Sequence, residues 1–293
     1  MSCCDGQNAR VGRAIREIDA AEITEAVSKL CIKANLELPE DVVEALHSAV
    51  ETEDFPAAAD TLCLLEKNLE IARARKIPVC QDTGAACVFA EIGQDAHING
   101  DFEAAVNAGV RKGYTEGFLR KSIVKDPVRR GNTEDNTPAF ITTHLVSGDK
   151  IKLTVLPKGF GSENMSRVAM LKPADGLDGI KEFVLETVRL AGPNPCPPVV
   201  LGIGIGGTFD KVTALAKKAL MRPLNVKNAD PFYADLETEL LTAINKLGTG
   251  PQGFGGKTTC LGLAVEVLPT HVAGMPVAVN VSCHVTRRAS VVI

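Results

Sequence analysis

The sequence predicts an α/β protein, with a helical N-terminal region followed by a mixed α/β region. Residues 19–75 show helical periodicity in three segments, and from Pro78 onward β-rich runs alternate with helical segments. Of the 293 residues, 45% are hydrophobic and 23% are charged, which is typical of a soluble globular protein. We therefore expect a helical region over residues 1–77 and one contiguous α/β region over residues 78–293.

Two prolines divide the helical region. The stretches "NLELPED" and "EDFPAA" interrupt the periodicity, and Pro39 and Pro56 stand where helices can begin, because a helix start does not need the missing backbone N–H. Cys31 lies among apolar residues at helical spacing, and Cys63 lies in a leucine-rich run. Both are interpreted as small buried core residues.

The α/β region predicts strands and helices in alternation. Strands are expected at "AACVFAEIG", "FITTHLV", "KIKLTVL", "VVLGIGIGG", "LGLAVEVL" and "PVAVNVSC". Helices are expected over residues 101–120, 177–190, 211–220 and 231–247. The sequence ends in the apolar "ASVVI", which predicts a strand that pairs with something outside this chain.

Composition excludes several classes of function. The net charge is -4, tryptophan is absent and only two tyrosines occur, so a nucleic-acid-binding surface is not expected. No apolar run is long enough for a membrane span, and the N-terminus lacks an apolar signal core. Nine cysteines without a secretion signal indicate a reducing compartment. We therefore expect a cytoplasmic protein.

Three cysteines lie in polar or irregular surroundings. The segment "GPNPCPP" holds Cys196 among four prolines, which remove backbone donors and so exclude a helix or a central strand. Cys80 opens "CQDTG", and Cys283 ends a β-rich run. No CxxC spacing connects them, so the residues alone favour isolated core thiols over a zinc ribbon, a ferredoxin-type cluster or a catalytic thiol.

Two glycine-rich motifs resemble nucleotide-binding sequences. Gly202, Gly204 and Gly207 form the bare dinucleotide fingerprint, but the following "MRPLNVKNADP" does not read as a strand that could supply the acidic partner. Close strand–helix packing is the preferred interpretation, with dinucleotide or carboxylate binding as alternatives. "GTGPQGFGGKTT" imitates a phosphate-binding loop, but Pro251 stands where the pattern needs glycine, which disfavours nucleotide hydrolysis.

Six separated motifs together resemble one known family. They are "PVCQDTG", "LRKS", "KGFGSENMS", "NPCPP", "GFGGKTT" and "LPTHVAGMPVAVNVSCH", in this order. The chain is similar to the α-subunit, or the N-terminal half in fused forms, of class I fumarate hydratases. This family of oxygen-sensitive iron–sulfur hydro-lyases also contains the L-tartrate dehydratases. The resemblance covers nearly the whole chain and is weakest at its N-terminal end.

The resemblance implies a [4Fe-4S] cluster held by Cys80, Cys196 and Cys283, with a fourth iron that has no protein ligand. Cys260 competes for the third position, but Cys283 follows His271 by twelve residues, as in the family's motif. The prolines around Cys196 would hold this ligand still, and their missing N–H groups would limit hydrogen bonding to the cluster sulfurs.

The resemblance also implies a hydro-lyase mechanism in which the open iron acts as a Lewis acid. Gln81 and Asp82 would reach the substrate, with Asp82 in a proton-transfer network, and Arg120 would bind a carboxylate. The backbone near Gly161 and the His271 side chain would complete this half of the pocket. The ordinary alternatives are a solvated arginine, a turn aspartate and a structural histidine.

The expected substrate is a small dicarboxylate. We expect reversible hydration of fumarate to malate in the tricarboxylic acid cycle, with L-tartrate dehydration as the runner-up. The resemblance further implies a β-subunit, an α2β2 assembly, and no activity for this chain alone. A dinucleotide-binding protein and a non-catalytic α/β interaction module are the alternatives from other classes.

Overall fold

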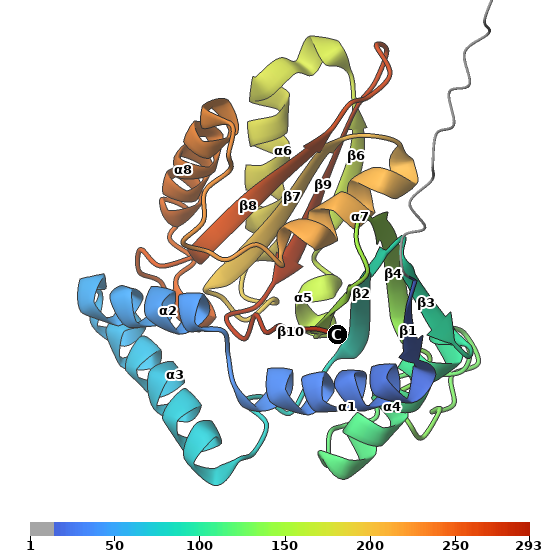
Figure 1. The fold of residues 1–293 in the computed structure, drawn as a ribbon. Coiled ribbons are helices and arrows are strands. Elements are labelled where there is room, and N and C mark those ends of the chain that lie inside the picture. The colour runs from blue at the N-terminus through green and yellow to red at the C-terminus, as the bar shows by residue number, and fades with distance from the viewer. Residues whose placement is uncertain (1–14) are drawn as a thin grey trace, which may run out of the picture.

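A computed structural model describes residues 15–293 and confirms the α/β class. The first 14 residues of the expected helical region lie outside the described residues. The described residues form two four-stranded sheets and a separate strand pair. Figure 1 shows helices packed against both larger sheets, with α2 and α3 beside the sheet that contains β8. Among residues 15–293, no helix combines the length and the apolar character needed to cross a membrane.

The helices and strands are the following. The helices are α1 (Ala20–Leu36), α2 (Glu40–Thr52), α3 (Pro56–Arg75), α4 (Phe102–Glu116), α5 (Phe160–Glu163), α6 (Gly176–Ala191), α7 (Phe209–Ala219) and α8 (Pro231–Asn245), with 3₁₀ turns η1 (Pro173–Asp175) and η2 (Pro251–Gly253). The strands are β1 (Arg16–Asp19), β2 (Ala85–Gly93), β3 (Ala96–Asn99), β4 (Phe140–Val146), β5 (Ile151–Lys158), β6 (Arg167–Leu171), β7 (Val199–Gly206), β8 (Cys260–Leu268), β9 (Met275–Ser282) and β10 (Ala289–Val292).

The first sheet has the strand order β10-β5-β2-β4, and only the β2–β4 pair is parallel. Helices α1 and α4 pack against each other and share a hydrophobic core with β2 and β5. The two helices approach closely because α4 carries glycine at the contact: a Cβ at Gly109 would lie 2.7 Å from the Cβ of Val27. The short strands β1 and β3 form a separate parallel pair.

The C-terminal strand corrects one expectation. The prediction that "ASVVI" pairs outside the chain is wrong, because β10 pairs antiparallel with β5. The backbones of Ile293 and Ile151 also exchange two hydrogen bonds, each of 2.9 Å. The apolar pattern predicts the strand correctly but does not identify its partner, which lies about 140 residues earlier in the chain.

The second sheet has the order β6-β9-β7-β8, in which β7 and β8 are parallel and β9 runs antiparallel to β6 and β7. Helices α6 and α8 pack their apolar sides against one face of this sheet and form a hydrophobic core with it. Helix α7 packs on β7 and β9, and Val212, Ala216 and Ala278 form the contact. The two central strands, β7 and β9, are almost entirely buried because helices cover both faces, whereas the edge strand β6 is largely exposed.

Helices α2 and α3 confirm the expected starts, since Pro39 caps α2 and Pro56 is the first residue of α3. Cys31 is buried in the first core, as expected. Cys63 is exposed on α3, so its interpretation as a core residue is wrong. The adjacent leucines divide between the two sides of the helix, with Leu62 buried and Leu64 67% exposed.

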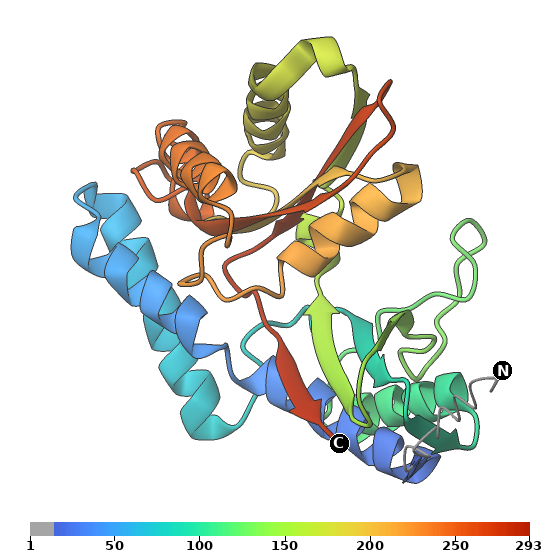
Figure 2. The same cartoon turned by 45° about the horizontal axis from the view of Figure 1, so that its top comes forward.

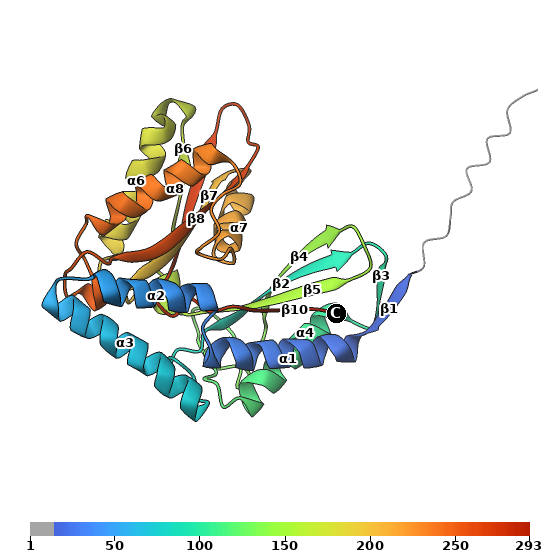
Figure 3. The same ribbon diagram turned by 60° about the vertical axis from the view of Figure 1, so that its left-hand side comes forward.

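The chain passes between the two sheets twice in its second half. Residues 159–166 lead from β5 to β6, and residues 283–288 lead from β9 to β10. Figure 3 shows the two sheets as separate layered bodies that come together beside α2, and Figure 2 shows the last strand returning to the first sheet. Helix α1 shares a core with strands of the 78–293 region, while α2 contacts β8. The division at residue 77 stays a prediction.

Candidate active site

The proline-rich loop holds Cys196 by its carbonyl groups. Cys196 is exposed and has a left-handed backbone, with φ of 55°. Its carbonyl accepts hydrogen bonds from His284, at 3.4 Å from the backbone N and 3.0 Å from Nδ1. The neighbouring Pro197 carbonyl accepts two more from the backbone N and Nε2 of Gln252. The loop is therefore irregular but fixed, as the prolines predict.

The other two thiols come from loops at the same place. Cys80 lies between α3 and β2, and its Sγ donates to Gln81 Oε1 at 3.2 Å. Cys283 directly follows β9. Burial raises the pKa of Cys196, and the charges of Cys283, Cys80 and Asp82 raise it further, so these groups share one electrostatic environment. The structure brings together three cysteines that are separated by 203 residues of sequence.

An apolar floor lies under two of these thiols. Cys80 and Cys283 pack against one buried cluster, whose members are Leu38, Val42, Ala72, Val79 and Val285. The cluster comes from the N-terminal helices and the two cysteine loops. Across residues 15–293, no group of three or more histidine, cysteine or acidic side chains converges closely enough to hold a single metal ion.

Cys260 lies elsewhere. It begins β8 inside the second core, and its thiol donates to the Gly262 carbonyl at 3.2 Å. Complete burial raises the pKa of Cys260 to about 12, which keeps the thiol protonated. Of the two candidates for a third ligand, only Cys283 lies with Cys80 and Cys196.

Asp82 is held at the boundary between the two sheets. Its carboxylate accepts hydrogen bonds from the backbone N–H of Gly84 at 3.0 Å and of Phe160 at 3.1 Å. Gln81 beside it is exposed. Thr83 ties the next part of the loop to Arg120: its Oγ1 accepts from the Arg120 N–H at 2.9 Å. Asp82 therefore bridges the first cysteine loop and the start of α5.

Arg120 and Gly161 flank this boundary. The Arg120 side chain is exposed, and its guanidinium has no hydrogen-bond or ion-pair partner within residues 15–293. Gly161 lies exposed in α5, and a Cβ there would lie 3.8 Å from the Asn194 carbonyl of the Cys196 loop. Both residues are thus available at the edge of the thiol site.

His271 lies at the other end of the second sheet. It is exposed in the loop between β8 and β9, and β9 alone, at about 3.4 Å per residue, separates this loop from Cys283 by roughly 24 Å. The single chain therefore does not bring His271 to the other expected site residues. Sequence spacing is misleading here because twelve residues fold as a long strand instead of a loop.

The motif "KGFGSENMS" supplies a charged network that residue-by-residue analysis missed. Glu163 forms ion pairs with Lys158, at 3.2 Å, and with Lys217, and it accepts from Asn280 Nδ2 at 2.8 Å. Burial raises the pKa of Glu163, but the two lysines outweigh this effect and hold it below its usual value. This carboxylate joins β5, α5, α7 and β9.

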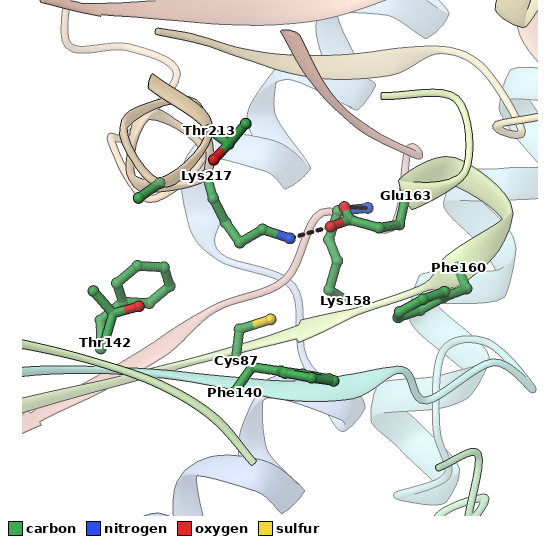
Figure 4. Close-up of a pocket in the computed structure, with 10 residues that line it drawn as sticks. Cys87, Phe140, Thr142, Lys158, Phe160, Glu163, Thr213 and Lys217 are labelled. Atoms are coloured by element: carbon green, nitrogen blue, oxygen red, sulfur yellow. Dashed lines mark hydrogen bonds and ion pairs between the residues drawn. The ribbon is translucent and has the colours of Figure 1, made fainter. Parts of the chain in front are cut away.

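A cavity of about 320 Å³ lies beside this network, between the first sheet and α7. Figure 4 shows Lys217 and Lys158 directed toward Glu163 above Cys87 and Phe140. Burial raises the pKa of Cys87, so this thiol also stays protonated. The cavity is lined by none of the three clustered cysteines.

Arg287 was also missed by sequence analysis. It is 2% exposed, and it donates from Nη2 to the Asp82 carbonyl and from Nε to the Pro157 carbonyl, the latter at 3.4 Å. Burial raises the pKa of Cys283, while the charges of Arg287 and Lys158 oppose this increase. Two buried cations therefore lie near the thiol site.

A comparison with known families decides the relationship. The model of the family described as fumarate hydratase (Fumerase) matches residues 24–292, which is nearly the whole chain. The chain belongs to the fumarate hydratase (Fumerase) family. This family of hydro-lyases supports an enzymatic role, and the resemblance expected from the six motifs is confirmed.

Similar chains carry the name of one subunit. A putative L(+)-tartrate dehydratase subunit alpha from Methanocaldococcus jannaschii is 41% identical over 275 residues, which cover 92% of this chain and 96% of that protein. The L(+)-tartrate dehydratase subunit alpha of Escherichia coli O157:H7 is 28% identical over 93% of this chain and 91% of its own length.

The dinucleotide-like glycines of this fumarate hydratase-family chain serve packing. A Cβ at Gly202 would lie 2.0 Å from the Ala216 carbonyl, and one at Gly204 would lie 2.4 Å from the Val212 carbonyl. Both positions allow α7 to lie directly on β7, which confirms the close-packing interpretation. The segment after α7 contains no strand before β8, as the sequence predicts.

The segment "GTGPQGFGGKTT", which resembles a phosphate-binding loop, binds a carboxylate of the same chain. Glu53 accepts hydrogen bonds from the backbone N–H of Lys257 and of Thr258, each at 3.0 Å, and from Thr258 Oγ1 at 2.8 Å. Glu53 is 8% exposed and ends α2. Its side chain therefore occupies the amide donors to which a phosphate would bind, and it anchors this loop to the N-terminal helices.

We expect Glu53→Gln to destabilise the fold by about 1–3 kcal/mol near neutral pH. The carboxylate accepts hydrogen bonds from five donors, and the NH₂ group of the glutamine amide cannot accept from the donors that would face it. Burial raises the pKa of Glu53, but these hydrogen bonds hold it below the usual 4.5. The stabilisation is therefore complete above about pH 4.5 and is lost as the pH falls through the lower folded value. Thermal unfolding at several pH values measures both effects.

Asp54→Asn is the matched control. Asp54 is exposed and pairs only with the Lys257 side chain, so this variant should have the Tm of the wild type. Equal Tm values for the two variants would contradict the role of Glu53.

Proposed function

We propose that this chain is the α-subunit of a [4Fe-4S]-dependent hydro-lyase that reversibly hydrates fumarate to malate. The observation that carries the proposal is the convergence of Cys80, Cys196 and Cys283 from three loops at the meeting point of the two sheets. Family membership supports the reaction class.

The chemistry of the donor set fits an iron–sulfur cluster. Thiolates are the ligands that such clusters take from proteins, and each of three thiolates can bind a different iron, so convergence on a single point is not required. The apolar floor below Cys80 and Cys283 limits water on one side. The charges of Arg287 and Lys158 favour the thiolate form of Cys283 that a metal requires.

When bound, a cluster with one iron free of protein ligands supplies a Lewis acid that activates a hydroxyl group for departure. The chain's own residues do the remaining work on this side of the pocket. Asp82 holds its carboxylate beside the thiols by two backbone N–H bonds, where it can accept or return a proton. The free guanidinium of Arg120 can bind one substrate carboxylate in a bidentate manner. Gln81 and the exposed backbone at Gly161 can donate further hydrogen bonds.

We propose a β-subunit as the second part of the site and α2β2 as the assembly. The exposure of Gln81, Arg120 and Gly161 supports this, because a hydration site needs walls that exclude bulk water. The names of the similar chains as alpha subunits agree with it. A role for His271 requires a neighbouring chain in that assembly. Cytoplasmic location belongs to the same proposal, since free thiols require a reducing compartment.

L-Tartrate is the second candidate substrate. It is favoured by the names of the similar chains, of which the M. jannaschii protein is 41% identical. Tartrate and malate differ by one hydroxyl group, so both offer the same carboxylates to Arg120. The dinucleotide alternative has lost its support, because Gly202 and Gly204 are occupied by packing against α7.

Anaerobic reconstitution tests the cluster. We expect about four irons and four sulfides per chain, with a broad visible absorption band, and loss of most of this iron in Cys283→Ser. Cys260→Ser is the matched control: its hydroxyl can keep the bond to Gly262, and it should load like the wild type. A folded wild-type chain without iron would contradict the cluster assignment. Equal loss of iron in Cys283→Ser and Cys260→Ser would contradict it as well.

The substrate and the partner are tested together. We expect the loaded chain to be inactive alone and, with its β-subunit, to hydrate fumarate with a higher kcat/KM than it dehydrates L-tartrate. Ultraviolet absorbance follows fumarate, and a coupled assay follows the oxaloacetate formed from tartrate. Full activity without a partner would refute the two-subunit proposal. Turnover of L-tartrate but not of fumarate would make L-tartrate the substrate in place of fumarate.

We expect Asp82→Asn to lower kcat by about 10²–10⁴-fold while iron content stays at the wild-type level, because an amide keeps one acceptor but cannot exchange the proton. Steady-state kinetics on the loaded assembly, with iron analysis of the same samples, provide the measurement. Asp210→Asn is the control, since this exposed carboxylate lies at the start of α7, at the opposite end of β7 from Cys196. An unchanged kcat in Asp82→Asn would remove Asp82 from the mechanism.

A further inference from the structure

Arg287 carries a buried charge with no counter-ion. Its side chain is 2% exposed, and within residues 15–293 it forms no ion pair with a carboxylate. Its Nη1 is buried without a hydrogen-bond partner, while Nη2 and Nε donate only to backbone carbonyls. A buried cation without an anion is strongly unfavourable, so the arrangement calls for an anion at this place.

The nearby charged groups do not supply this anion. Glu163 already pairs with Lys158 and Lys217, so it serves two cations. The Asp82 carboxylate lies beyond ion-pair distance from Arg287 and accepts from two backbone N–H groups instead. Around the thiol site, three buried or half-buried cations therefore face two carboxylates.

The adjacent residue shows the contrast. Arg288 is also buried, and one of its nitrogens also lacks a partner, but its Nη2 pairs with Asp41 at 2.6 Å. Asp41 in turn accepts from the Leu224 N–H at 2.8 Å. Asp41 therefore neutralises the charge of Arg288, whereas no carboxylate pairs with Arg287.

The place of Arg287 identifies the missing anion. It follows Cys283 by four residues, and Thr286 closes the intervening turn by donating to the Cys283 carbonyl at 2.8 Å. Its Nη2 donates to the carbonyl of Asp82, which lies two residues after Cys80. The guanidinium therefore joins the loop that carries Cys80 to the segment that carries Cys283.

We infer that Arg287 is the counter-cation of the iron–sulfur cluster, with its unpartnered Nη1–H donating to a thiolate or sulfide sulfur. The inference rests on the proposed function, since it needs a cluster at this site. Donors and positive charge near cluster sulfur stabilise the more reduced, more negative state. Arg287 is therefore a positioning residue that raises the reduction potential and slows oxidative loss of iron.

Two neutral variants test this inference, Arg287→Met and Arg287→Gln, together with Arg287→Lys, which keeps the charge. Each is reconstituted anaerobically, and the midpoint potential of the cluster is measured by a redox titration followed by electron paramagnetic resonance. Release of iron in air and Tm of the apoprotein and loaded protein are measured on the same samples. Arg288→Met is the matched control.

We expect both neutral variants to show a lower potential and several-fold faster iron release, with the apoprotein Tm unchanged or higher, because the apoprotein loses an unpaired charge. Arg287→Lys should recover most of the potential. Arg288→Met should lower Tm of the apoprotein and the loaded protein alike and leave the potential unchanged, since it breaks a structural pair.

Three results would overturn the inference. One is a wild-type potential and iron-release rate in the loaded neutral variants. Another is a change only in substrate affinity, which would assign Arg287 to the substrate. The third is failure of both neutral apoproteins to fold, because the apoprotein is the form in which the charge lacks its anion. Absence of iron from the folded wild type would instead refute the proposed function.

Discussion

The return of the chain from the second sheet to the first, over only six residues, is the constraint on which the site depends. Strands β9 and β10 belong to different sheets, so residues 283–288 force the sheets together at this point. Three residues of the segment each fix another part of the chain: His284 binds the Cys196 carbonyl, Arg287 binds the Asp82 carbonyl, and Arg288 pairs with Asp41 of α2. The thiols meet there because the crossing brings their loops together.

Charge reinforces this junction. The Glu163 carboxylate joins α5 to a lysine of the first sheet and to a lysine of α7, so it connects both bodies through one anion. With Arg287 and the exposed Arg120, the junction holds more positive than negative side chains, although the whole chain has a net charge of -4. A local excess of positive charge suits the anionic cluster and the dianionic substrate of the proposed function, because both would lose hydration on binding.

Local patterns in the sequence predict local structure well. Apolar alternation locates the long strands, and proline positions locate two helix starts, but the short strands β1, β3 and β6 were not predicted. The glycine turn is correctly interpreted as packing because its acidic partner is missing. Partners far apart in sequence are not encoded in such patterns. The pairing of β10 with β5, the exposed side of α3 that carries Cys63, and the carboxylate of Glu53 in the phosphate-like loop all depend on tertiary contacts. The thiol site itself was implied by resemblance, since spacing alone favoured isolated cysteines.

The form of the site also agrees with the proposed partner subunit. A CxxC site can form from one turn, but three thiols on three loops come together only after both sheets have folded and docked. The proposed cluster site therefore depends on the whole chain. The same arrangement places Cys196, Gln81, Arg120 and Gly161 on the exposed side of the junction, while the apolar floor closes the other side. A reaction that activates one hydroxyl group must exclude bulk water from both sides. The chain supplies one wall, and in the proposed function the β-subunit supplies the second.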